Sequence, residues 1–355
     1  MSVCPRCEVL PSKIDGPRDY YLWFPLGHSH AKVRRTFEET GAAWRPDPET
    51  GASVLSVDPA TFRSIGGRLL DVLSSEEIRA TRILAVSPGD GPGRRDYPAV
   101  TSLRQMLAFQ DSNWLLDALA REDLSVRFAP IAFADAVEEV FAHQADVAVR
   151  NASGDEVDGV ALLQIAQEAG LLFQADRLAR IAAIKEAEAQ RIDTPLFVTF
   201  SPAAIYDPTF CLRTTVAALE ATSIPKDAVC FTIVAPERWD DPRHLRTILD
   251  FYRGSGFRVA LGGVGSGASS LSLIETLKPD IIFVDRGIVA SVDADTYKQV
   301  IARKLLEIAQ RLRIESVVGG IATEAEMTWA YEQGANYVQG PYLTRHMEPR
   351  SVRVA

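Results

Sequence analysis

The chain has 355 residues, of which 47% are hydrophobic and 24% are charged, a composition that suits one large core and a smaller second one. The formal net charge is −9, and no lysine- or arginine-rich block stands out, which argues against binding to nucleic acid or to an anionic membrane. No long apolar run and no secretory signal are present, so we expect a cytoplasmic protein. The four cysteines are too few for a disulfide framework.

The first part of the chain shows the alternation expected of a small α+β domain. Residues 19–26 and 80–87 are rich in aromatic and aliphatic side chains and predict strands. Helices are predicted over 29–41, which ends at a glycine, and over 60–74, with a hairpin over 42–57 between them. The order βαββαβ predicts a ferredoxin-like sandwich.

A glycine- and proline-rich segment, 87–100, separates this part from a region with a different pattern of apolar residues. We therefore predict a small N-terminal module over 1–98 and a larger domain over 99–350. In the larger domain, apolar runs alternate with helical segments, as in parallel βα units whose strands are buried on both faces. About 250 residues of such units predict a (β/α)8 barrel. An open doubly wound sheet is the alternative, less favoured because no G-x-G-x-x-G motif opens the first βα turn.

The runs that predict barrel strands are 125–133, 195–201, 228–234, 257–263, 280–285, 315–320 and 336–340. In a βα barrel, the C-terminal ends of the strands build the active site. Here those ends carry Thr199, Thr232, Gly262 with Gly263, Phe283 with Asp285, Gly319 with Gly320, and Gln339. Asp285 is the single carboxylate among them, whereas a catalytic magnesium site usually needs several. We therefore do not expect magnesium to bind.

Four segments carry a resemblance to a known family. They are FSPAAIYDPTF at 200–210, GVGSGASSLSLIETLKPDIIFVDR at 263–286, VVGGIATEAEM at 317–327 and GANYVQGPYLTR at 334–345. Together they resemble the EAL domains, (β/α)8-barrel phosphodiesterases of the bacterial second messenger cyclic di-GMP. The resemblance runs from about Ser102 to about Met347.

The departures from the family pattern fall on its functional positions. The resemblance implies that Gln144, in VFAHQADVAVR, replaces the metal-binding glutamate of the signature, and that Phe283 replaces the catalytic lysine. It also implies that Asp285 and Gln339 are retained. The other metal-binding or acidic family positions become Thr199, Thr232, Ala235, Gly262, Gly263, Gly319 and Ala322.

We therefore predict a catalytically inactive, EAL-like regulatory protein that acts through contact with a protein partner in bacterial signalling. By resemblance alone, a homodimer is also expected. One alternative is a receptor that binds cyclic di-GMP without hydrolysing it. Against it, the family's Q-P-I segment appears as Ala129-Pro130-Ile131, and its signature arginine as Ala148 unless Arg150 takes that place after a small insertion. A second alternative is an enzyme with an unusual site.

Cys4 and Cys7, in CPRC, have the spacing of half a zinc site. His28 and His30, in PLGHSH, are the candidates to complete a Cys2His2 set. The alternatives are plain thiols in a loosely ordered tail or a redox-sensitive pair, with the two histidines at the start of a helix.

For several of these residues, an ordinary structural role is the alternative to a functional one. The Gly262-Gly263 pair suits a turn that needs positive φ, and Asp285 suits an ion pair or the cap of the following helix. Cys211 and Cys230 are predicted to be buried as small hydrophobes.

Overall fold

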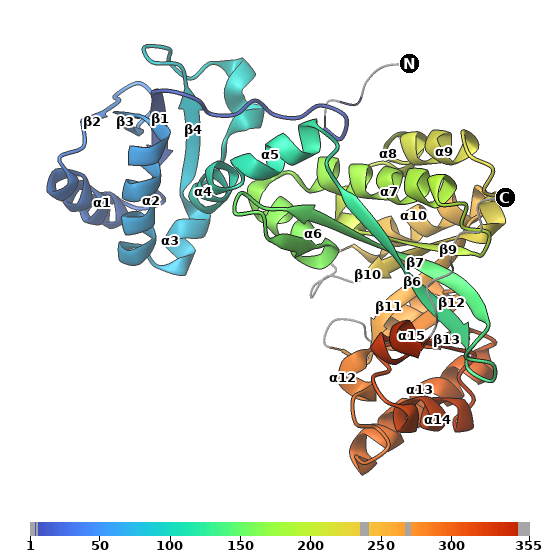
Figure 1. Ribbon diagram of the computed structural model, residues 1–355. Coiled ribbons are helices and arrows are strands. Elements are labelled where there is room, and N and C mark those ends of the chain that lie inside the picture. The colour runs from blue at the N-terminus through green and yellow to red at the C-terminus, as the bar shows by residue number, and fades with distance from the viewer. Residues whose placement is uncertain (1–3, 5, 235–240, 267–270, 347–355) are drawn as a thin grey trace.

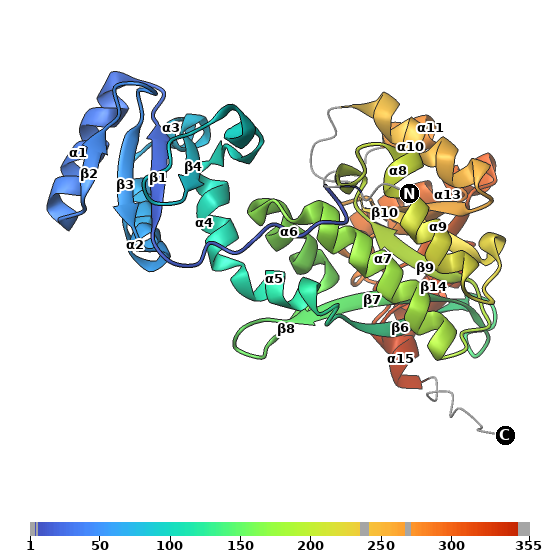
Figure 2. The same cartoon turned by 90° about the horizontal axis from the view of Figure 1, so that it is seen from above.

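The computed structural model describes Cys4 and residues 6–234, 241–266 and 271–346. It has two parts, a small α+β domain and a larger barrel, joined by two short helices (Figures 1 and 2). Within the described residues, no helix combines the length and the apolar character needed to span a bilayer.

The N-terminal domain has the predicted βαββαβ order, with one extra short helix before β4 and one extra two-residue strand after it. Its sheet is ordered β2-β3-β1-β4-β5, and β1 is antiparallel to both β3 and β4. The elements are β1 (Arg18–Trp23), α1 (Gly27–Thr40), β2 (Trp44–Pro46), β3 (Ser53–Val57), α2 (Pro59–Val72), α3 (Ser75–Ala80), β4 (Arg82–Val86) and β5 (Thr101–Ser102).

Strand β1 has apolar side chains on both faces. Tyr20 and Leu22 pack with the helices in one cluster, while Tyr21 and Trp23 belong to a second cluster on the opposite face. Local signals set the helix ends: α1 ends at Gly41 with φ of 65°, as predicted.

The glycine- and proline-rich segment folds back onto this domain and contains the 3-10 helix η1 (Arg94–Ala99). Its Gly89 N–H donates to Asp19 at 3.1 Å. The next element, α4 (Leu103–Asp111), still contributes Leu103 and Leu107 to the core of the first domain. The predicted boundary between 98 and 99 therefore precedes a helix that packs on the N-terminal side.

Helix α5 (Asn113–Ala120) turns away from α4 and packs against α6 and α7 of the barrel domain through Leu115, Leu116 and Leu119. Helix α4 also contacts α6. The two parts of the molecule thus share the α4–α5 pair.

Eight of the described strands close a barrel in the order β6-β14-β13-β12-β11-β10-β9-β7, with β6 paired to β7. The predicted (β/α)8 barrel is confirmed, except that β6 is antiparallel to both of its neighbours. The strands are β6 (Ser125–Phe133), β7 (Val140–Arg150), β9 (Leu196–Phe200), β10 (Val229–Val234), β11 (Arg258–Val264), β12 (Ile281–Val284), β13 (Glu315–Val318) and β14 (Tyr337–Gln339), and β8 (Glu156–Asp158) extends β7.

Helices surround the barrel and cover the outer faces of its strands (Figure 2). They are α6 (Gly159–Ala169), α7 (Leu172–Ala189), η2 (Pro202–Ala204), α8 (Pro208–Cys211), α9 (Arg213–Glu220), η3 (Lys226–Ala228), α10 (Pro242–Gly254), α11 (Leu271–Leu277), α12 (Arg286–Val289), α13 (Thr296–Leu312), α14 (Glu324–Glu332) and α15 (Pro341–His346).

Alternation along each strand divides the barrel residues into two clusters. One set packs outward against the helices, and the other fills the interior of the barrel. The interior cluster is Ile131, Ala142, Phe197, Cys230, Ala260, Ile281, Phe283, Val317 and Tyr337, with Phe133 and Phe141 packed against it. Cys230 and Cys211 are both buried, as predicted.

Candidate functional site

The candidate site lies at the mouth of the barrel. Seven predicted positions each stand two residues beyond a member of the interior cluster, in the direction of the strand. Because side chains alternate with a period of two, all seven face the barrel interior at one end. They are Gln144, Thr199, Thr232, Gly262, Phe283, Gly319 and Gln339.

Two amides meet at this mouth. Gln339, at the end of β14, donates through Nε2 to Oε1 of Gln144 on β7 at 2.9 Å. Strand β6 lies between these two strands, since it pairs with β14 on one side and β7 on the other. The bond therefore ties the barrel together across the strand that runs antiparallel.

Thr232 and Thr199 lie side by side on β10 and β9. Thr232 is 4% exposed, and its Oγ1 has no hydrogen-bond partner in the described structure. A buried hydroxyl in this state is uncommon, because its desolvation is not offset by a hydrogen bond.

Phe283 fills the interior where the family resemblance implies a lysine. It is 8% exposed, and its ring packs edge-on against Phe197 with centroids 5.4 Å apart. This position thus supplies apolar volume in place of a charge.

Two glycines at the mouth have left-handed backbones. Gly263 has φ of 65° and Gly320 has φ of 79°. A Cβ at Gly320 would also stand 2.6 Å from Cβ of Arg286. The structural alternative for the glycine pair is therefore confirmed for Gly263, whose conformation disfavours other residues.

Asp285 caps a helix. Its Oδ1 accepts from the backbone N–H of Gly287 at 2.7 Å, at the start of α12. The capping role considered from the sequence is confirmed.

A buried ion pair supports one edge of the mouth, and sequence reasoning missed it. Asp176 and Arg180 on α7 are each 1% exposed and 2.9 Å apart. Asp176 Oδ1 accepts from Ser201 N–H at 2.7 Å just after β9, and Arg180 donates to Thr215 on α9 at 2.8 Å. Burial raises the pKa of the Asp176 carboxyl, while Arg180 acts in the opposite direction. The available signal was an Asp and an Arg four residues apart on an otherwise apolar helix face.

The structure does not bring the two cysteines and two histidines together. Cys7 lies against the barrel, where its carbonyl accepts from Arg177 on α7, while both histidines lie in α1 of the N-terminal domain. His30 Nε2 is 3.0 Å from Ser53 Oγ, and His28 is 3.6 Å from Glu77. Over the described ranges, no three Cys, His, Asp or Glu side chains are grouped as a metal site requires.

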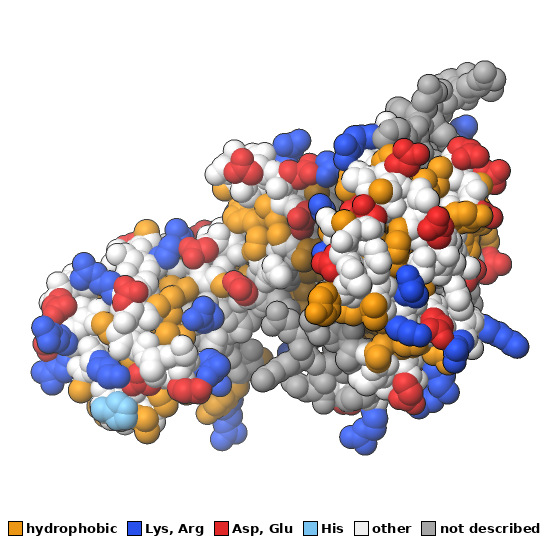
Figure 3. All heavy atoms as spheres, turned by 90° about the horizontal axis from the view of Figure 1, so that it is seen from below, with side chains coloured by type: hydrophobic (Ala, Val, Ile, Leu, Met, Phe, Trp, Pro, Cys, Tyr) orange, Lys and Arg blue, Asp and Glu red, His pale blue; other side chains and the backbone are white. Residues whose placement is uncertain are grey.

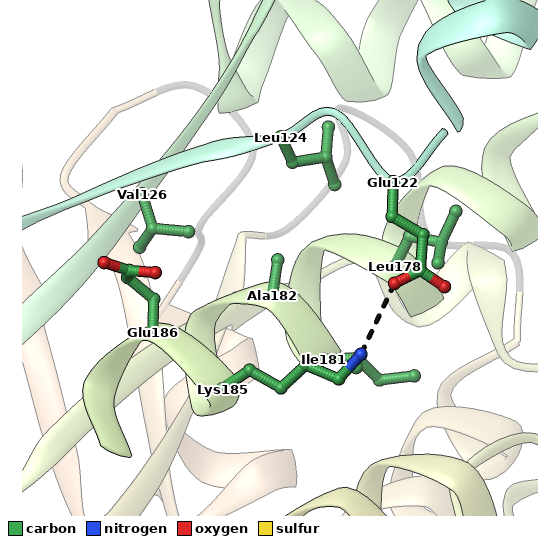
Figure 4. Close-up of a pocket in the computed structure, with 8 residues that line it drawn as sticks. All are labelled: Glu122, Leu124, Val126, Leu178, Ile181, Ala182, Lys185 and Glu186. Atoms are coloured by element: carbon green, nitrogen blue, oxygen red, sulfur yellow. Dashed lines mark hydrogen bonds and ion pairs between the residues drawn. The ribbon is translucent and has the colours of Figure 1, made fainter. Parts of the chain in front are cut away.

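A shallow groove lies on the outside of the barrel, between the start of β6 and α7 (Figure 4). Leu124, Val126 and Ile181 contribute apolar surface, and Lys185 pairs with Glu122 at 3.4 Å on its rim. Basic and acidic side chains are interspersed over the face shown in Figure 3. Because the groove lies on the outer surface of the barrel, it is separate from the seven interior-facing positions at the mouth.

These features define a (β/α)8-barrel domain that follows a small α+β domain in the sequence. Among the described residues, the seven interior-facing positions at its mouth carry no charge. Residues 112–346 match the family model of the EAL domain. The chain therefore belongs to the EAL domain family.

Among curated relatives, the chain is similar to two probable cyclic di-GMP phosphodiesterases of Escherichia coli strain K12. It is 35% identical to PdeB over 100 residues, 28% of this chain and 19% of that protein. It is 30% identical to PdeD over 96 residues, 27% of this chain and 18% of that protein. The match thus spans about a fifth of these relatives.

Two solved structures are also similar. A standalone EAL protein of Vibrio cholerae O395, in its c-di-GMP-bound form, aligns with a TM-score of 0.54 and 28% identity over 62% of this chain and 90% of its own. The Klebsiella pneumoniae protein BlrP1, as a calcium and cy-diGMP complex, aligns with a TM-score of 0.55 and 17% identity over 92% of this chain and 95% of its own. At that identity, BlrP1 shares the fold alone.

Proposed function

We propose that this protein is a catalytically inactive EAL-domain protein that regulates cyclic di-GMP signalling by binding another protein. The observation that carries the proposal is the identity of the seven residues at the barrel mouth: two with amides, two with hydroxyls, one with a phenyl ring and two glycines. None of the seven carries a charge.

This set is unsuited to metal-assisted phosphodiester hydrolysis. Carboxylates hold the divalent cations Mg²⁺ and Mn²⁺, and the bound cation lowers the pKa of the attacking water. The Gln144 and Gln339 amides bind each other, and the Asp285 carboxylate caps α12. The interior volume at Phe283 is apolar, so it offers no charge to a phosphate or a leaving group.

The catalytic half of the proposal is tested with the purified full chain. We expect no linear product from cyclic di-GMP in the presence of Mg²⁺ or Mn²⁺, measured by chromatography beside an active EAL domain as positive control. Metal-dependent product that disappears on substitution of Asp285→Asn would overturn it, because this carboxylate would then be acting on a metal.

The binding half requires a partner that contacts the barrel directly. Cross-linking in the producing cells, followed by mass spectrometry, should give linked peptides from one other protein, and the purified pair should then bind in the absence of cyclic di-GMP. A purified pair that associates only when the nucleotide is added would contradict this mode of action.

A nucleotide receptor is the second candidate function. It is favoured by the hydroxyl of Thr232, which faces the mouth and has no partner among the described residues, and by the nucleotide-bound form of the similar Vibrio cholerae protein. Titration calorimetry separates the two: the scaffold gives no heat at tens of micromolar protein, whereas a receptor gives saturable heat that Gln339→Ala weakens.

A further inference from the structure

Residues 6–10, here called the strap, lie against the barrel even though β1, the strand that follows, belongs to the N-terminal domain (Figures 1 and 2). Between strap and strand, residues 11–17 form neither helix nor strand. The strap is thus a short segment seated on the barrel. Its connection to β1 also makes contacts, since Lys13 pairs with Asp117 of α5 at 2.5 Å and Ile14 packs against the N-terminal core.

Helix α7 holds the strap by its backbone. Arg177 Nε donates to the carbonyl of Cys7 at 2.8 Å, and Gln174 Nε2 donates to the carbonyl of Val9 at 3.0 Å. Proteins commonly hold a peptide through hydrogen bonds to its main-chain carbonyls, because such bonds do not depend on the sequence of the peptide.

The side chains of the strap add a sequence requirement. Glu8 pairs with Arg213 of α9 at 2.5 Å, with the side chains 17% and 24% exposed. The Arg6 guanidinium lies over two rings, 5.2 Å from the centroid of Phe173 and 5.4 Å from that of Tyr206.

Between these two charged residues, Cys7 is 2% exposed. Burial raises the pKa of Cys7 to about 12, so it acts as a small uncharged side chain. The surface that contacts the strap, here called the seat, is formed by Phe173, Gln174, Arg177, Tyr206 and Arg213. These contacts favour a basic, a small buried and an acidic residue in that order.

The strap leaves one buried polar atom of its seat without a hydrogen bond. Gln174 is 7% exposed, and its Oε1 has no partner in the described structure although its Nε2 binds Val9. A buried acceptor without a donor is costly. Tyr206 is still 71% exposed although Arg6 lies over its ring, and the nearby Phe210 is 56% exposed, so the same surface offers apolar area that the strap leaves uncovered.

We propose that this surface of α7, α8 and α9 is a peptide-binding site, filled by the strap in this structure and taken over by a segment of the partner protein. That segment carries the basic–small–acidic order of Arg6, Cys7 and Glu8 and donates a backbone N–H to Gln174. The inference rests on the proposed function, since it names the surface through which the barrel would bind its partner.

A charge swap tests the site in the full chain. The probe is a fluorescent peptide with the sequence of residues 4–12, kept reduced and followed by anisotropy. Glu8→Arg sets two arginines against each other and frees the seat, so this variant should bind the probe about tenfold more tightly than the wild type. Adding Arg213→Glu restores internal pairing and removes the probe's own partner, so binding should return to the wild-type level.

Equal binding of the probe by all three proteins, or binding by none, would overturn the proposal. Circular dichroism and melting temperature show whether each variant is folded. If Glu8→Arg unfolds, Glu8→Ala with Arg6→Ala frees the seat without placing two like charges together, and the same comparison applies.

The kind of partner is tested by selecting random peptides on the freed seat. Peptides selected on the Glu8→Arg variant should share a basic–small–acidic order and should compete with the probe. Selection on the single variant Arg213→Glu, in which two acidic side chains face each other and free the seat, should replace the acidic position by a basic one. Peptides with no common order would contradict the stated specificity. Neither experiment measures hydrolysis, so their failure would leave the proposed inactivity of the barrel standing.

Discussion

At the scale of single residues, the buried hydroxyl of Thr232 is an unusual feature of the barrel mouth. The side chain is 4% exposed, and Oγ1 lacks a partner in the described structure. Threonine and valine have nearly the same shape, so replacing the hydroxyl by a methyl removes an unpaired polar atom without opening a cavity.

We expect Thr232→Val to stabilise the barrel by about 1 kcal/mol, because the desolvation cost of the hydroxyl disappears. Denaturant unfolding measures the change. Thr199→Val is the matched control: this neighbour on β9 is half-buried, so its hydroxyl can reach water and the substitution should change stability little. Loss of stability in Thr232→Val alone would mean that a buried water or ligand satisfies the hydroxyl.

The strand-end residues could be predicted from the sequence because their pattern is local. Apolar runs that end in glycine or threonine mark strands entering turns, and the barrel brings such ends together whatever residues they carry. The interior position of Phe283 follows in the same way from alternation along β12. The Gln144–Gln339 bond could not be predicted, since it joins residues 195 positions apart and depends on how β6 closes the barrel.

At the scale of elements, β7 was not among the runs predicted as strands. Its sequence interrupts the apolar pattern with His143, Gln144 and Asp146, so hydrophobicity alone gives a weak strand signal. Its pairing with both β6 and β9 fixes it in the barrel. The sequence likewise did not predict that β6 runs antiparallel to its neighbours, because the residues of a single apolar strand do not indicate its direction.

The ion pair of α7 belongs to the same scale, because it joins three elements. Asp176 binds the turn after β9, and Arg180 reaches α9 through Thr215. Both charged side chains are enclosed, so each depends on the other for its electrostatic compensation.

We expect Arg180→Met to destabilise the barrel by about 3–5 kcal/mol, because it leaves the Asp176 carboxylate buried without its cation. The double variant Asp176→Leu with Arg180→Met removes both charges and should recover most of the loss. Denaturant unfolding of the three proteins forms the comparison. A double variant no more stable than Arg180→Met would show that the pair holds the β9 turn through its hydrogen bonds rather than through charge balance.

At the scale of the whole molecule, α4 ties the two parts together. Its residues Leu103 and Leu107 pack in the N-terminal core, and the helix also contacts α6 of the barrel domain. Near its end, Gln110 donates to the hydroxyl of Tyr20 on β1 at 2.9 Å, and both side chains are buried. The Tyr20 ring also stacks on Phe62 of α2 with centroids 3.9 Å apart.

This arrangement was not foreseen, since glycine and proline placed the expected linker before α4 rather than after it. Those residues instead form a surface loop over the first sheet, as the bond between Gly89 and Asp19 shows. Composition marks where a chain turns, but it does not tell on which core the next helix packs.

A helix shared by two cores should couple their unfolding. We expect the full chain to melt in one calorimetric transition, and Tyr20→Phe to split it, with the N-terminal domain melting first. The phenylalanine keeps the stack on Phe62 but removes the acceptor of Gln110, whose buried amide then costs about 1–3 kcal/mol. Adding Gln110→Leu to Tyr20→Phe removes that amide and should restore a single transition. Two well-separated transitions in the wild type would instead mean that α4 transmits little between the N-terminal domain and the barrel.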